Sequence, residues 1–129
     1  MKHTVTCVLK FKEKILIMKR SQKVGSFQGF YGMVAGYIEP DETPDEAAIK
    51  EVEEEAGLRQ DQFKLIKKGE PFKVAKDGRS WVVHPYLFEV NMDEIKIDWE
   101  HDNFEWILPK DLKKYNYVPG LDKIIEMFL

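Results

Sequence analysis

Residues 36–58 read GYIEPDETPDEAAIKEVEEEAGL, and the second half of this stretch concentrates glutamates just before a glycine. The stretch carries the start and stop signals of an amphipathic helix over about residues 44–56. Thr43 is placed as the N-cap, Pro44 follows it and suits the first helical position, and Glu46 stands at the spacing of a capping box with Thr43. Gly57 is placed to end the helix. This segment is the clearest helix in the chain.

Three of the glutamates share one side of this predicted helix. At about 100° per residue, Glu51, Glu54 and Glu55 stand at i, i+3 and i+4, so their carboxylates are neighbours that repel one another. A hard divalent cation such as Mg²⁺ prefers oxygen ligands and would relieve this repulsion. The alternative is a solvated acidic face, which is common on helices. The apolar side, predicted to pack on a sheet, consists of Ala48, Ile49, Val52 and Ala56.

Bulk composition limits the classes of function. The chain has 129 residues with 43% hydrophobic and 33% charged residues, which suits one soluble domain over residues 1–129. The chain has a formal net charge of −3, so it lacks the excess of basic residues that is typical of proteins that bind duplex nucleic acid. No apolar run is long enough for a membrane span. The single cysteine, Cys7, is expected to be a small buried side chain in a reducing compartment, and we expect a cytoplasmic protein.

The rest of the chain is rich in strand signals. Residues 3–10 and 13–20 are apolar and β-branched, and a short aromatic strand follows a glycine-rich loop. The segment FKLIKKGEPFKVAKDGRSWVVHPYLFEV predicts strands joined at Lys68-Gly69 and at the Asp-Gly turn of Lys76-Asp77-Gly78. FEWILP predicts one more short strand, residues 110–114 a helical turn, and residues 121–128 a C-terminal helix. The pattern is mixed α/β rather than a series of βαβ units.

The spacing around the acidic helix is specific. Gly36 is followed after five residues by Glu42 and after seven more by Lys50, which begins KEVEEEAGL. This arrangement resembles the Nudix box, G-x5-E-x7-R-E-U-x-E-E-x-G-U, in which U is an aliphatic residue. The one departure within the box is Lys50, where the family has arginine. The matching positions are Gly36, Glu42, Glu51, Val52, Glu54, Glu55, Gly57 and Leu58.

The resemblance extends over about residues 4–115, in the family's usual order. KILIMKRS is similar to the second strand of the family, and GFYGMVAGYIEPDETPDEAA to the lead-in to its helix. Ala35 and Asp41 stand where many members carry glycine. In EHDNFEWILPKDL an acidic residue, Glu100, precedes Trp106 by six positions, as in the later segment of the family.

The resemblance implies a fold and a reaction. The expected fold is an α/β/α sandwich with a mixed sheet and the catalytic helix at about residues 44–56. The expected reaction is metal-dependent hydrolysis of a nucleoside diphosphate linked to another group, with Mg²⁺, or Mn²⁺ as a substitute. Carried over by position, Glu51, Glu54 and Glu55 are the metal ligands, with the Gly36 carbonyl as a further candidate. Members of the family differ in where the general base lies, and the candidates in this chain are Glu54 and Glu100.

Further residues are assigned as hypotheses. Lys50 is expected to pair with a glutamate of the box and orient it, although lysine lacks the bidentate fork of arginine. Lys19 and Arg20 are expected to bind substrate phosphates; the alternative is that both are solvated strand-end cations. Phe27 and Tyr86 are the preferred platforms for a base, although most aromatic residues at strand spacing belong to the core.

The substrate stays open at this stage. The short chain is most similar to small, MutT-like nucleoside triphosphate pyrophosphohydrolases, which release a monophosphate and pyrophosphate. ADP-ribose or a dinucleoside polyphosphate is the alternative within the family. Outside enzymes, the alternatives are a catalytically silent domain that binds nucleotides and an acidic interaction helix without metal. We expect a small-molecule partner, no duplex nucleic acid, no membrane, and a monomer or homodimer.

Overall fold

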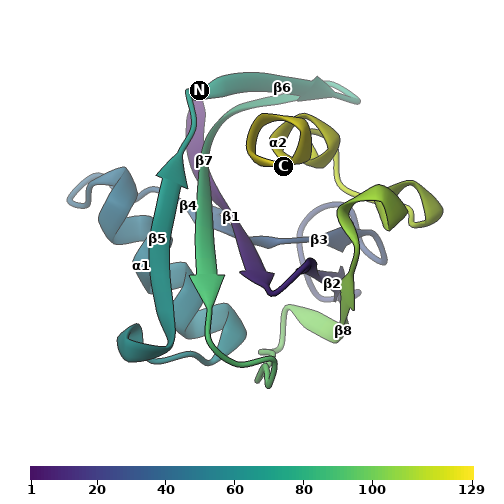
Figure 1. The fold of residues 1–129 in the computed structure, drawn as a ribbon. Coiled ribbons are helices and arrows are strands. Elements are labelled where there is room, and N and C mark those ends of the chain that lie inside the picture. Colours follow the sequence, from purple (N-terminus) through teal and green to yellow (C-terminus); the bar gives the residue numbers. More distant parts are fainter.

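The computed structural model describes residues 1–129 and contains one eight-stranded mixed sheet with a helix on each face (Figure 1). The helices are α1 (Pro44–Ala56) and α2 (Leu121–Phe128), with short 3-10 helices at Gln60–Gln62 and Pro109–Lys114. The strands are β1 (Lys2–Phe11), β2 (Lys14–Arg20), β3 (Tyr31–Gly32), β4 (Val34–Tyr37), β5 (Phe63–Lys68), β6 (Phe72–Lys76), β7 (Arg79–Val90) and β8 (His101–Ile107).

Strand β1 is the centre of the sheet. It runs parallel to β7 over its length and antiparallel to β4 at one end and to β2 at the other. The order of neighbours is β3-β2-β1-β7-β5, with β4 on β1, β6 on β7 and β8 on β2. On the edge of β1 that faces away from β7, the first half of β1 pairs with β4 and its end pairs with β2. Strands β4 and β2 therefore diverge from each other.

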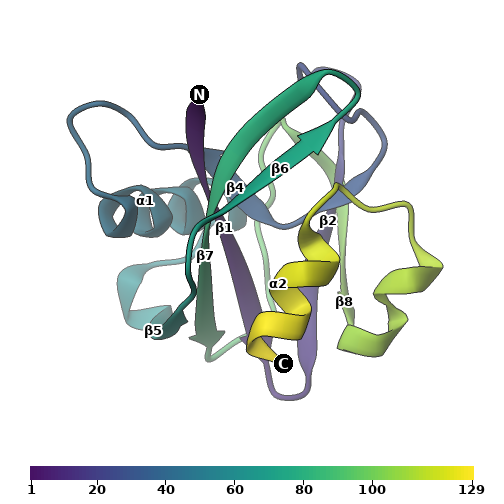
Figure 2. The same ribbon diagram turned by 90° about the horizontal axis from the view of Figure 1, so that it is seen from above.

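The alternation of side chains along β1 builds two cores. Val5, Cys7 and Leu9 point toward α1, where Ala48 and Val52 complete the first cluster. On the opposite side, Val8 joins Ile15, Ile17 and two residues of α2, Leu121 and Ile124, in the second cluster. Figure 2 shows α1 and α2 on opposite faces of the sheet. The expected α/β/α sandwich is therefore confirmed.

The ends of α1 are fixed by the signals in its sequence. The Thr43 hydroxyl accepts the Glu46 N–H at 3.1 Å, and the Glu46 carboxylate accepts the Thr43 N–H at 2.8 Å, so the capping box is formed. Gly57 ends the helix in a left-handed conformation with φ 67°. The bounds expected for the helix hold.

Several local expectations need correction. The junction expected at Lys68-Gly69 is present, since β5 ends at Lys68, and both β5 and β6 pair with the long strand β7 rather than with each other. Strand β8 begins at His101, three residues before FEWILP. On α1, Ile49 is only half-buried, whereas Ala47 is fully buried. Asp77-Gly78 does form the expected tight turn, with positive φ at both residues. No helix is both long and apolar enough to cross a bilayer.

Candidate active site

The Glu55 side chain is buried between α1 and β4. It is 2% exposed, and its carboxylate accepts the Ala35 N–H at 3.2 Å. Glu55 also shares a side-chain hydrogen bond with Glu51. Burial, and then the bond to Glu51, raises the pKa of Glu55 to about 10. Burial likewise raises the pKa of Glu51. Two adjacent carboxyl groups in this position need either a proton or a cation between them.

Gly36 on β4 lies directly against the Glu51 carboxylate. A Cβ atom at position 36 would stand 2.4 Å from Glu51 Oε2, closer than real contacts allow. The φ of Gly36 is not in the left-handed region, so the requirement for glycine here is one of space. The absence of a side chain lets the β4 backbone and the helix carboxylate lie close together.

Replacing Gly36 with alanine should impair the site more than the fold. The three nearest atoms to the new methyl group all belong to the Glu51 side chain, Cγ included at 2.8 Å, so that side chain must turn away from β4 while the backbone stays in place. We expect Mg²⁺ affinity to fall about 10- to 100-fold, as when a residue supporting a metal ligand is lost. Calorimetric titration measures this, and a thermal melt should shift by only a few degrees. Gly25→Ala is the control, since a Cβ there meets no atom within 4 Å; equal Mg²⁺ affinity in both variants would refute this role of Gly36.

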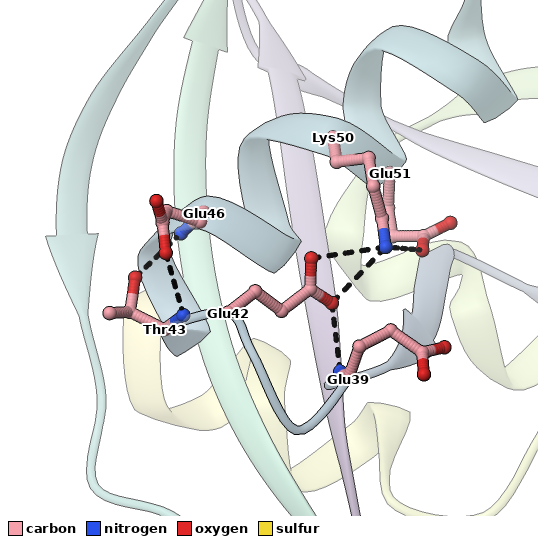
Figure 3. A network of polar contacts seen from close by, with 6 residues as sticks. All are labelled: Glu39, Glu42, Thr43, Glu46, Lys50 and Glu51. Carbon is pink, nitrogen blue, oxygen red and sulfur yellow. Dashed lines mark hydrogen bonds and ion pairs between the residues drawn. The ribbon is translucent and has the colours of Figure 1, made fainter.

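Lys50 connects the helix to the turn that precedes it (Figure 3). Its ammonium group donates to both oxygens of Glu42 at 3.1 Å and lies 3.9 Å from Glu51. Glu42 in turn accepts the Glu39 N–H at 2.9 Å, and that bond is the first cause of its lowered pKa. Lys50 therefore contacts a glutamate of the box. The bonds of Glu42 to Lys50 and to the Glu39 N–H link α1 to the turn that precedes it, which is a structural role.

A Lys50→Arg variant should hydrolyse substrate at least as fast as the wild-type protein. Arginine keeps the positive charge and adds a planar fork that can hold both oxygens of Glu42. Steady-state kinetics on the two proteins measure the effect. Lys50→Met, which removes the charge, is the comparison that should lose activity. A sharp fall in kcat on Lys50→Arg would show that the lysine does more than orient a neighbouring carboxylate.

A cleft of about 830 Å³ opens beside these carboxylates. Its walls come from α1, β1, β4, β7, the end of β2, the loop at residues 26–27 and residues 118–124. The structure brings most of the predicted site residues into this one cleft. Those that line it are Arg20, Phe27, Gly36, Lys50, Glu51, Glu54, Glu55 and Glu100.

Two predicted site residues do not line the cleft. Lys19 precedes Arg20 on β2, where successive side chains face opposite sides, and only Arg20 lines the cleft. Tyr86 is 3% exposed in the core beneath α1, and its hydroxyl donates to Asp45 at the start of that helix. Asp45 also accepts a bond from Lys68. The hypothesis that Tyr86 stacks on a base is therefore wrong, because its ring is enclosed by the core and its hydroxyl anchors α1.

Arg20 is a half-buried cation in the wall of the cleft. Its guanidinium donates to the Ser26 carbonyl at 3.1 Å and to the Ser26 hydroxyl at 3.4 Å. Burial lowers the pKa of Arg20, and the nearby Glu100 carboxylate opposes that effect. Burial also raises the pKa of Glu100, with the charge of Asp98 as the second cause. Arg20 thus holds the loop beside Phe27 and faces the carboxylates at the same time.

Trp81 lines the cleft, although the sequence favoured Phe27 and Tyr86 over it as platforms for a base. Its ring centroid lies 6.1 Å from that of Phe27, and both residues line the cleft. Phe27 adopts a left-handed φ of 49°, at the point where its loop approaches β7. The alternation along β7 could have shown that Trp81 and Tyr86 face opposite sides of the sheet. Nothing local in the sequence indicates that a loop after β2 contacts a strand fifty residues later.

The donor set suits a hard divalent cation. Every candidate ligand is an oxygen, and the crowded pair Glu51 and Glu55 needs positive charge or a proton. The side chains form no ready-made group of three or more acidic, histidine or cysteine residues around a single point. Glu54 directly precedes Glu55 on α1 and is exposed. Its carboxylate would complete such a group by turning toward Glu51 and Glu55. The residues therefore fit a magnesium-type ion.

Comparison with known proteins gives a family. The NUDIX domain model matches residues 1–128. Nucleoside triphosphatase NudI of Escherichia coli is 27% identical over 126 residues, which cover 87% of this chain and 85% of NudI. Octanoyltransferase of Myxococcus xanthus is 30% identical over 122 residues, which cover 88% of this chain. A solved structure of a C. elegans Ap4A hydrolase superposes with a TM-score of 0.84 at 21% identity, covering 99% of this chain and 95% of that one.

The matched proteins differ in length. The chain spans 31% and 26% of the first two curated relatives that it matches, against 85% of NudI. The likeness to the Ap4A hydrolase structure, at 21% identity, shows the shared fold.

Proposed function

The chain belongs to the Nudix hydrolase family, and from this premise we propose that it hydrolyses a nucleoside diphosphate linked to another group. The preferred substrate in this proposal is a nucleoside triphosphate, cleaved to a monophosphate and pyrophosphate. The required ion is Mg²⁺, with Mn²⁺ as a substitute. The similarity to NudI, which the chain matches over most of both lengths, supports the choice of a triphosphate.

One observation carries the proposal: the carboxylates and an aromatic pair line a single cleft. Gly36 pairs with Val5 on β1, and Trp81 on β7 pairs with Lys2. With strands about 4.8 Å apart and a rise of about 3.3 Å per residue, the Cα atoms of Gly36 and Trp81 are roughly 14 Å apart. A nucleoside with its phosphate chain can bridge this separation, with its base on Phe27 and Trp81.

In this proposal, different residues of the cleft bind the phosphates and accept the proton of the attacking water. Arg20 would bind a phosphate oxygen, exchanging part of its contact with Ser26 for a charged partner. A bound divalent cation would neutralise the diphosphate and activate water. Glu54 or Glu100 would accept the proton of the attacking water, since both carboxylates line the cleft. Burial raises the pKa of Glu100, so its ionised carboxylate is a stronger base than an ordinary glutamate.

Product analysis by mass spectrometry tests the proposal. The protein is incubated with Mg²⁺ and a panel of canonical and oxidised nucleoside triphosphates, ADP-ribose, NADH and diadenosine polyphosphates. We expect a nucleoside monophosphate and pyrophosphate from one group of triphosphates, and no products when EDTA is added. Faster cleavage of ADP-ribose or a diadenosine polyphosphate would replace the triphosphate assignment. Cleavage of no compound in the panel would refute the proposal and favour a silent domain that binds nucleotides.

Removing the Phe27 ring should weaken substrate binding without slowing the chemical step. Stacking on a base contributes about 1–3 kcal/mol, so Phe27→Ala should raise KM about 10-fold and change kcat little. Phe30→Ala is the matched control. Phe30 belongs to the same loop and its ring lies 5.6 Å from that of Phe27, but it does not line the cleft. The same KM in the Phe27 variant and the wild-type protein would exclude this ring as the platform.

A further inference from the structure

The backbone of Glu100 is fixed on both sides. Its N–H donates to Asp98 Oδ1 at 3.2 Å, and its carbonyl accepts the Ser21 N–H, just beyond the end of β2, at 2.8 Å. Residues 91–100 before β8 form no helix or strand. Within that irregular stretch, these two bonds determine where the Glu100 side chain begins.

Asp98 accepts a second bond that anchors it. The same Oδ1 atom lies 3.1 Å from His101 Nδ1, and the His101 side chain is 3% exposed. Burial lowers the pKa of His101, so the ring is neutral near pH 7 and its Nδ1–H donates to Asp98. A buried imidazole therefore holds the carboxylate that in turn holds the Glu100 N–H.

The pairing of β2 with β8 contains an irregularity at the same place. Lys19 pairs with Asn103, but Arg20 pairs with His101, so Asp102 is an extra residue on β8. Such a bulge changes the direction of the residues around it. Here it brings His101 beside Arg20 and leaves Glu100, immediately before β8, as part of the wall of the cleft.

We propose that Asp98 is a positioning residue for hydrolysis: by accepting the Glu100 N–H and the His101 ring, it holds the Glu100 carboxylate where it accepts a proton. This inference rests on the proposed function and on Glu100 as the base. Asp98 itself does not line the cleft, so it acts through Glu100. Without it, the short turn from Asp98 to His101 would lose the side-chain acceptor that orders it.

Three variants separate geometry from charge. Asp98→Ala removes both the charge and the acceptor oxygen, whereas Asp98→Asn removes the charge and keeps an oxygen that can accept the Glu100 N–H. Asp102→Ala, at the exposed bulge position, is the control for an acidic residue lost from the same segment. Each protein is assayed for kcat and KM on the substrate found for the wild-type protein, and for amide hydrogen exchange at Glu100.

The positioning role predicts a specific pattern. In Asp98→Ala, kcat should fall about 10- to 100-fold with KM nearly unchanged, as expected when a catalytic group is misplaced. Exchange at the Glu100 amide should accelerate, while exchange along α1 stays at the wild-type rate. Asp98→Asn should restore most of kcat and of the amide protection. Asp102→Ala should match the wild-type protein.

Three results would overturn the inference, and they distinguish a failure of the positioning role from a failure of the proposed function. Wild-type activity in the Asp98→Ala variant, or equal loss in the Asn and Ala variants, would refute the positioning role and leave the proposed function intact. An inactive wild-type protein would refute the proposed function and the positioning role together.

Discussion

Replacing Glu54 with glutamine should lower kcat by about 10³-fold, because the variant loses a carboxylate that serves as a metal ligand or as the base. Glu54 is exposed on α1 and lines the cleft beside Glu51 and Glu55. Its removal should therefore leave the thermal melt of the metal-free protein nearly unchanged. Steady-state kinetics with saturating Mg²⁺ measure the effect.

Glu53 provides the matched control for this experiment. It precedes Glu54 on the same helix, is also exposed, and does not line the cleft. Glu53→Gln removes the same charge from the same helix and should keep the wild-type kcat. Equal losses in the two variants would mean that the overall charge of α1 matters and that Glu54 has no role of its own.

The second large effect concerns stability and pH. The folded protein raises the pKa of Glu55 from 4.5 to about 10. The folded state then binds this proton more tightly than the unfolded state, so the contribution of Glu55 to stability is fully present below pH 4.5. As pH rises from 4.5 toward about 10, the metal-free protein should lose stability by up to about 1.4 kcal/mol per pH unit. The raised pKa of Glu51 acts in the same direction.

Glu55→Gln should remove most of this slope, since the amide stays neutral at every pH. We expect the metal-free variant to melt several degrees above the wild-type protein at pH 8, and near it at pH 5. Mg²⁺ should raise the melting temperature of the wild-type protein at pH 8, because a bound cation stabilises the ionised pair. It should raise that of the variant much less. Parallel pH profiles for the two metal-free proteins would contradict a buried, protonated Glu55.

The parts that sequence could predict are those with local signals. The capping box at Thr43, the proline after it and Gly57 determine the bounds of α1 by contacts within the helix itself. The spacing from Gly36 to Glu51 is also a local signal, and the structure gives it a physical reason in the close approach of β4 and α1. These features could be predicted because each depends on residues close in the chain.

The parts that sequence could not predict depend on distant contacts. The sequence around Tyr86 does not distinguish an aromatic residue of the cleft from one of the core. The distinction comes from the hydrogen bond between Tyr86 and Asp45, which lies forty-one residues earlier in the chain. Trp81 lies against Phe27, which comes from a loop far earlier in the chain. The role inferred for Asp98 depends on a bulge that shifts the register by one residue. Propensity and periodicity do not encode such pairings.

Calorimetric titration with Mg²⁺ shows most directly whether the glutamates of α1 hold a divalent cation. We expect one saturable class of sites in the wild-type protein and in Glu53→Gln, and its loss in Glu51→Gln and Glu55→Gln. We also expect release of protons on binding at pH 8, because the buried pair must ionise. The contradicting result is weak binding without saturation that is the same in all four proteins, which would identify α1 as a solvated acidic surface.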